Sequence, residues 1–87
     1  MAKYFIASPH TKEECVRALE DTLAQGPQVL AKYEYGCMAG DHTAYAFVDA
    51  PNETSARNYV PSSLRAKARF VEVSQFTPEQ IKSFHMK

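Results

Sequence analysis

The chain has 87 residues, and its ten basic and ten acidic side chains give a formal net charge of zero. A neutral chain lacks the basic surface that attracts nucleic acids and anionic membranes, so we expect neither as a partner. The sequence holds no run of the roughly 18 apolar residues that a transmembrane helix needs, and its N-terminal apolar run is too short for a signal peptide. We therefore expect one cytoplasmic domain over residues 1–87, whose two cysteines are free thiols.

The first segments of the chain predict a strand followed by a helix. Residues 3–8 favour β-structure and are ended by a proline. Thr11 and Glu14 then have the spacing of a capping box, so we expect a helix that begins there and ends at the Gly-Pro pair 26–27. The Ser-Pro pair 8–9 offers a competing start, because serine caps helices and proline suits the first helical position.

The middle of the chain predicts a β-hairpin. Bulky side chains alternate with smaller or polar ones over residues 32–39 and again over residues 42–48, and Gly40-Asp41 between them is a turn signal. Two strands joined by a tight turn would account for this pattern.

The last third of the chain adds a helix, a strand and a second helix. Asn52 can cap a short helix over residues 53–59, and residues 67–73 predict the fourth strand. Thr77 and Gln80 form a further capping box, so we expect a C-terminal helix over about residues 77–86. Its apolar side chains should dock on the rest of the domain; they are Ile81 and Phe84.

This order of elements, βαββαβ plus a C-terminal helix, predicts an α+β fold of the ferredoxin-like kind. Such a fold has a four-stranded antiparallel sheet with helices on one face, which leaves the other face open.

The open face should be rich in aromatic side chains. Residues two apart along a strand share a face, and this rule separates small side chains from a bulky set. The bulky set is Tyr4, Ile6, Tyr33, Tyr35, Tyr45, Phe47 and Phe70. Six rings on one face would expose roughly 900 Å², against about 300–600 Å² for the largest patch of a typical monomer. We therefore expect a homodimer through this face, with or without a small hydrophobic ligand enclosed between the subunits.

The chain resembles a group of small dimeric α/β-barrel proteins. The resemblance rests on the element order, the Gly40-Asp41 turn, the passage Val-Asp-Ala-Pro-Asn-Glu at 48–53 and the Phe-Thr-Pro-Glu at 76–79. Within the group, the chain is similar to GYD-domain proteins and to small nickel-binding ferredoxin-like proteins, although it carries Gly-Asp-His at 40–42 where GYD members carry Gly-Tyr-Asp. The resemblance implies a dimeric barrel. The group also includes enzymes, namely monooxygenases and muconolactone isomerase. No catalytic residue matches the enzyme members.

Reactive side chains should meet at one edge of the sheet, where the first strand ends and the hairpin turns. That edge would gather His10, Cys15, Cys37, Asp41, His42 and Arg65. Imidazole and thiolate groups suit zinc or nickel, and a Cys–His pair could instead perform nucleophilic or redox chemistry. Because Cys15 lies on the apolar stripe of its helix, we expect it in the core. The expected metal ligands are His10, Cys37, Asp41 and His42.

Three functions follow from these patterns. The favoured one is a dimeric domain without assigned activity, whose aromatic sheet face forms the interface. The alternatives are a small monooxygenase- or isomerase-like enzyme that works in the sheet cavity, and a divalent-metal module at the hairpin edge. The metal is the one cofactor that the sequence suggests, and nothing in the sequence decides whether the protein is an enzyme.

Overall fold

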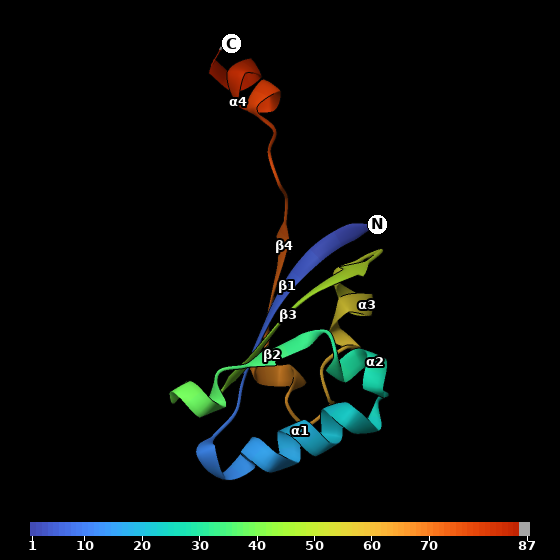
Figure 1. The fold of residues 1–87 in the computed structure, drawn as a ribbon. Helices are drawn as coiled ribbons and strands as arrows, with labels where there is room; N and C mark the ends of the chain where they lie inside the picture. Colours follow the sequence, from blue (N-terminus) through green and yellow to red (C-terminus); the bar gives the residue numbers. More distant parts are fainter. Residues whose placement is uncertain (86–87) are drawn as a thin grey trace.

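The computed structural model describes residues 1–85 and has an α+β fold with one four-stranded antiparallel sheet. The strands lie in the order β2-β3-β1-β4 (Figure 1). They are β1 (Ala2–Pro9), β2 (Tyr33–Tyr35), β3 (Thr43–Ala50) and β4 (Arg69–Val73). The helices are α1 (Cys15–Ala24), α2 (Pro27–Leu30), α3 (Glu53–Arg57) and α4 (Pro78–His85). In this part of the chain no helix is both long and apolar enough to cross a bilayer.

The predicted start of the first helix is confirmed at Thr11. The Thr11 hydroxyl accepts a hydrogen bond from the Glu14 amide at 3.2 Å, and the Glu14 carboxylate accepts one from the Thr11 amide at 2.9 Å. A single 3-10 turn over Lys12–Glu14 leads from this cap into α1. The competing start at Pro9 is wrong, because that residue still belongs to β1.

The predicted hairpin is correct in outline but too long on its first side. β2 ends at Tyr35, and the chain then forms a 3-10 turn over Cys37–Ala39 that ends at Gly40, whose φ is +91°. Hydrogen bonds from Asp41 N to Gly36 O at 2.9 Å and from Gly36 N to Thr43 O at 3.1 Å close this loop. Cys37 therefore lies in a compact loop and not in a strand.

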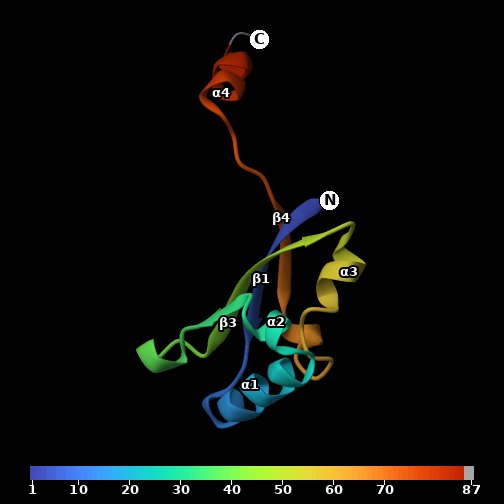
Figure 2. The ribbon, with the colours of Figure 1, turned by 45° about the vertical axis from the view of Figure 1, so that its right-hand side comes forward.

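Helices α1, α2 and α3 lie on one side of the sheet (Figures 1 and 2). The register places Tyr4 opposite Val48, and both Ile6 and Tyr33 opposite Ala46, on the side that these helices cover. Large side chains thus lie beside small ones on the covered face. The small ones leave room for the tyrosine rings between the sheet and the helices. Five residues expected on the open face lie instead on the covered face, and that part of the prediction is wrong: Tyr4, Ile6, Tyr33, Tyr35 and Phe70.

The open face carries a smaller aromatic cluster than expected. Phe5 lies between Tyr45 and Phe47, with ring centroids 6.0 and 5.2 Å away. Phe47 is 60% exposed and Val71 is 39% exposed. Three rings, two of them partly covered, fall within the range of an ordinary monomer's largest patch, so area alone does not demand a partner.

Helix α4 stands away from the body of the domain at the end of an extended segment (Figures 1 and 2). The chain's radius of gyration is 15.5 Å, whereas a compact chain of this length would have about 12 Å. The expected capping box of α4 forms, with Thr77 N donating to Gln80 Oε1 at 2.8 Å. The expected docking on the domain is wrong, because Ile81 is 48% exposed and Phe84 is 56% exposed. Residue 86, at the end of the expected helix, lies outside the described residues.

We expect the Ile6→Ala variant to lose about 2–5 kcal/mol of unfolding free energy, because it leaves a cavity in the centre of the covered face. Ile6 is fully buried. The matched control is Val16→Ala on α1, which removes a side chain that is 66% exposed and should change stability by less than about 0.5 kcal/mol. Urea denaturation measures both values, and equal losses would contradict the described core.

Candidate metal centre

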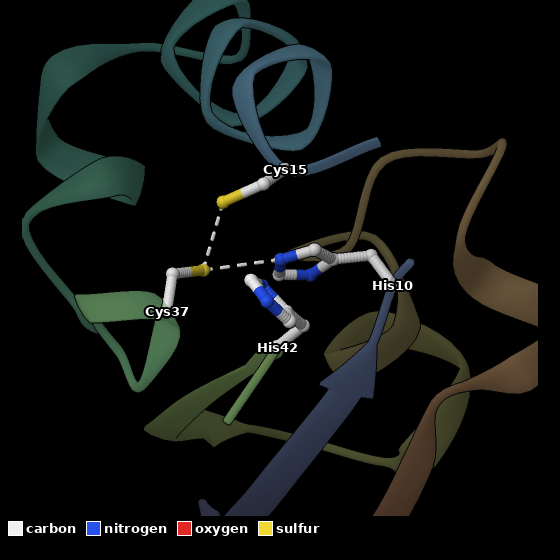
Figure 3. Close-up of side chains that lie close together, drawn as sticks. All are labelled: His10, Cys15, Cys37 and His42. Atoms are coloured by element: carbon white, nitrogen blue, oxygen red, sulfur yellow. Dashed lines mark hydrogen bonds between the residues drawn. The ribbon is translucent and has the colours of Figure 1, made fainter. Parts of the chain in front are cut away.

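Four side chains from separate segments converge at one end of the sheet (Figure 3). Their candidate ligand atoms all lie within 4.8 Å of one another. One of the four residues is buried and three are partly buried. We call this group the HCCH cluster; it consists of His10, Cys15, Cys37 and His42.

The capping box positions the first half of the HCCH cluster. His10 immediately precedes the N-cap Thr11, and Cys15 is the fourth residue after it. These two places are the ones whose side chains meet in a hydrophobic staple. The same geometry here brings an imidazole beside a thiol, so the helix start that the sequence encodes also sets the spacing of two candidate ligands.

The hairpin loop positions the second half. The His10 amide donates to the His42 carbonyl at 2.9 Å, which continues the β1–β3 pairing by one step beyond the strands. Cys37 sits in the 3-10 turn on the other arm of the loop, and the Gly36–Asp41 and Gly36–Thr43 hydrogen bonds hold that turn against the start of β3. The two halves of the cluster are therefore joined by backbone hydrogen bonds that do not depend on a bound ion.

The spacing of the cluster is close to that of a tetrahedral metal site. Cys15 Sγ lies 2.9 Å from Cys37 Sγ, and His10 Nε2 lies 3.2 Å from the same sulfur. Around a tetrahedral zinc ion, two sulfur ligands would be about 3.8 Å apart and a sulfur and a nitrogen about 3.6 Å apart. These two pairs would have to move apart by less than about 1 Å, whereas the widest pair in the cluster, separated by up to 4.8 Å, would have to close by a little over 1 Å.

The chemistry of the group also fits a cation. Burial, together with the hydrogen bond to Cys15, raises the pKa of the Cys37 thiol to about 11. A cation would have to displace this proton. It would also supply the positive charge needed to balance a partly buried thiolate. Among residues 1–85, His10 Nδ1 and His42 Nδ1 are both buried without a hydrogen-bond partner. Buried polar atoms are normally paired, so the His42 nitrogen has an unmet need for a partner. In His10 the nitrogen that faces Cys37 is Nε2, so its Nδ1 would stay unpaired even with an ion bound.

Asp41 was expected among the ligands, but it is not part of the HCCH cluster. Its carboxylate accepts a hydrogen bond from the Tyr45 hydroxyl at 2.6 Å, and this bond holds the pKa of Asp41 below its ordinary value. Arg65 is also engaged elsewhere, since its guanidinium donates to the Val60 carbonyl at 2.9 Å. Cys15 takes the place that the sequence analysis gave to Asp41. The staple position of Cys15 was the signal for this role, but its place on the apolar stripe favoured the core.

Two surface hollows lie away from the cluster. One has a volume of about 360 Å³ between Val29, Pro51 and Tyr59, and the other has about 530 Å³ beside Phe47 and Val73. Neither is lined by a member of the HCCH cluster.

Comparison with known proteins finds no match to the chain among family models, curated sequences or solved structures.

We expect Gly36→Ala to disrupt the cluster more than Gly40→Ala. A Cβ at Gly36 would lie 2.7 Å from the Asp41 carbonyl oxygen, so the loop that carries Cys37 and His42 would have to move. A Cβ at Gly40 would meet open space. The Gly40→Ala variant should therefore lose only about 1–2 kcal/mol of stability, which is what a positive φ costs a non-glycine residue. Amide chemical shifts of His10 and Cys15, recorded by NMR, should move in the first variant only. Shifts in both variants would show that the cluster depends on the whole turn.

Proposed function

We propose that this protein binds one divalent transition metal ion at the HCCH cluster. The observation that carries the proposal is the convergence of four soft or borderline ligand atoms within 4.8 Å, from two stretches of the chain, residues 10–15 and 37–42. Both cysteines of the chain and two of its three histidines take part. The buried His42 Nδ1 has no hydrogen-bond partner among the described residues, which also supports a ligand at this place.

Zinc suits this ligand set best. Two thiolates and two imidazoles are a common set for structural zinc, which takes four protein ligands in a tetrahedron. The two negative thiolates would neutralise the charge of the divalent ion, so the ion and its ligands could remain partly buried. Nickel is the alternative metal, and a site that prefers nickel would have to reshape toward a square-planar arrangement.

A closed set of four protein ligands favours a structural or metal-holding role over catalysis. Catalytic zinc sites keep one position open for water or substrate. The monooxygenase- or isomerase-like alternative would act at the open sheet face, where the hollow beside Phe47 and Val73 lies, and the cluster does not line that hollow. In a domain as small as this one, metal binding adds folding free energy that the core alone supplies only in part.

The fold and the compartment belong to the same proposal. The element order and the strand order β2-β3-β1-β4 support a ferredoxin-like arrangement like that of the small α/β-barrel proteins. A reducing cytoplasm would keep Cys15 and Cys37 as the free thiols that the ion needs.

We expect the purified, reduced chain to bind one zinc ion per chain with nanomolar or tighter affinity, as structural zinc sites do. Substituting Cys15→Ser, Cys37→Ser or His42→Ala should each weaken binding at least tenfold, because each removes one ligand. Competition titration against a chromophoric chelator measures the affinities, and the visible spectrum of the cobalt form reports tetrahedral thiolate coordination.

The matched control for this experiment is Asp41→Asn. This variant keeps an oxygen that can accept the Tyr45 hydrogen bond, so the loop should stay folded and the zinc affinity should stay within about threefold of the wild type. Equal affinities in the wild type and all ligand variants would overturn the proposal. Parallel titration with nickel decides between the two metals.

We also propose that the protein forms a homodimer through the open sheet face. One row of that face runs Glu34, Tyr45, Ala7, Arg69 across the four strands, and a parallel row includes Asp49 and Lys3. The acidic side chains thus lie on β2 and β3 and the basic ones on β1 and β4. A two-fold axis along the strands, between β1 and β3, would set Glu34 against the partner's Arg69.

The same axis would pair the aromatic side chains and the remaining charges. Phe47 would face the partner's Phe5, and Asp49 would face the partner's Lys3. Exposed rings of Phe47, Phe76 and Phe84, each more than half exposed, offer roughly 250–450 Å² per chain. A standard interface buries about 800 Å² per partner, a little over half of it apolar. The face and the α4 arm together therefore supply apolar area of the required size.

We expect the dimer to respond to charge reversal in a paired way. Glu34→Arg and Arg69→Glu should each weaken dimerisation, because each sets like charges against one another across the interface. The double variant should restore most of the wild-type affinity. Analytical ultracentrifugation measures the three constants, and Glu20→Arg on the exposed side of α1 is the control.

Deleting residues 76–87 should also weaken the dimer, while the unfolding free energy of the diluted monomer stays the same, since α4 stands apart from its own domain. A wild-type monomer at micromolar concentration would overturn the dimer proposal and leave the metal proposal intact.

A further inference from the structure

The two thiols of the HCCH cluster are closer to each other than a metal site requires. Cys15 Sγ lies 2.9 Å from Cys37 Sγ, and both thiols are free. We propose that Cys15 and Cys37 also form a reversible disulfide, made by exchange with a low-molecular-weight disulfide, and that this bond and the metal exclude each other. The inference rests on the proposed metal site for its second half and on the thiol pair alone for its first.

The observed separation lies midway between two chemical states. A disulfide requires a sulfur–sulfur distance of about 2.05 Å, and two thiolates on a tetrahedral zinc ion are about 3.8 Å apart. From 2.9 Å, either state is reached by a shift of less than about 1 Å. The pair is therefore placed for both outcomes, and no rearrangement of the sheet is needed for either.

The local backbone allows such a shift on one side. Cys15 begins α1 and is fixed by the Thr11 capping box. Cys37 lies in a single 3-10 turn between Gly36 and Gly40, outside any strand. Both cysteines are partly exposed, so a small disulfide can reach a sulfur. Movement of the turn by a fraction of an ångström would change the sulfur–sulfur distance while β1 and β3 stay paired.

The exchange balances without any further reactant. The thiolate of one cysteine attacks a sulfur of glutathione disulfide, forms a mixed disulfide and releases one glutathione thiolate. The second cysteine thiolate then attacks the protein sulfur of the mixed disulfide and releases the other glutathione. Two electrons pass from the cysteine pair to glutathione disulfide, and the two protons lost by the cysteines end on the two glutathione thiols. Reduction by excess glutathione runs the same steps backwards.

Oxidation removes two of the four metal ligands at once. The disulfide sulfurs carry no thiolate charge, so an ion would keep only His10 and His42. Conversely, a bound ion holds both sulfurs as ligands about 3.8 Å apart and keeps them from bonding to each other. The cluster would thus release its metal when the thiol–disulfide balance becomes oxidising and take it up again on reduction.

The test incubates the metal-free chain with glutathione buffers of increasing disulfide content. We expect a chain that is not cross-linked to another chain and is lighter than the reduced chain by about 2 Da, from the loss of two hydrogens. Zinc affinity should fall at least about 100-fold in this product, because half the ligands are lost. One equivalent of zinc added first should slow the oxidation by a similar factor. Cys15→Ser is the matched control, since it can form only the mixed disulfide or a cross-linked pair of chains.

Three results would overturn all or part of the inference, and they differ from those that concern metal binding alone. Reduced protein that binds zinc but yields only mixed or intermolecular disulfides would reject the thiol pair as a redox site, with the metal proposal unaffected. An intramolecular disulfide in a protein that binds no zinc when reduced would reject the mutual exclusion together with the metal proposal. Oxidised protein that keeps its zinc affinity would also reject the exclusion.

Discussion

The hydrogen bond from the His10 amide to the His42 carbonyl, 2.9 Å long, is the contact on which the candidate site depends. It carries the β1–β3 pairing past the ends of both strands and sets the two imidazoles side by side, with ring centroids 5.9 Å apart. The chain leaves this point in two directions, toward the helix cap at Thr11 and back through the hairpin loop. Each direction reaches a cysteine within five residues, and the two thiols meet because both routes are closed by their own hydrogen bonds.

Local signals in the sequence predicted the elements that carry this site. Capping boxes at Thr11 and Thr77 and a cap at Asn52 depend on residues three apart, so they can be read without tertiary information, and all three form. The edge at which reactive side chains would gather was also predicted. The exact ligand set was not, because Asp41 and Cys15 exchange roles through contacts that the sequence does not state. Asp41 accepts from Tyr45, and Cys15 turns its sulfur toward Cys37.

The faces of the sheet were mispredicted for a different reason. Alternation within one strand shows which of its residues share a side. The register between strands decides which residues of the neighbouring strands lie on that same face of the sheet. Similar side chains were grouped together, whereas the structure pairs unlike ones, with Ile6 beside Ala46 and Tyr35 beside Ala44. Alanines on β3 leave room for the rings of its neighbours. The buried rings also keep polar partners, since Tyr33 donates to the Tyr59 carbonyl and Tyr35 to the Thr22 hydroxyl.

The two ends of the sheet have different characters, and this has a practical consequence. Both the start of β1 and the end of β4 lie at one end, since Lys3 pairs with Val73, whereas the cluster lies at the other, beyond the pairing of Pro9 with Thr43. The chain takes eight extended steps from Ala2 to His10, a span of about 26 Å at 3.3 Å per step. An affinity tag or a fluorophore joined to Met1, or an attachment to a solid support through it, would therefore leave the approach to the thiols and imidazoles free.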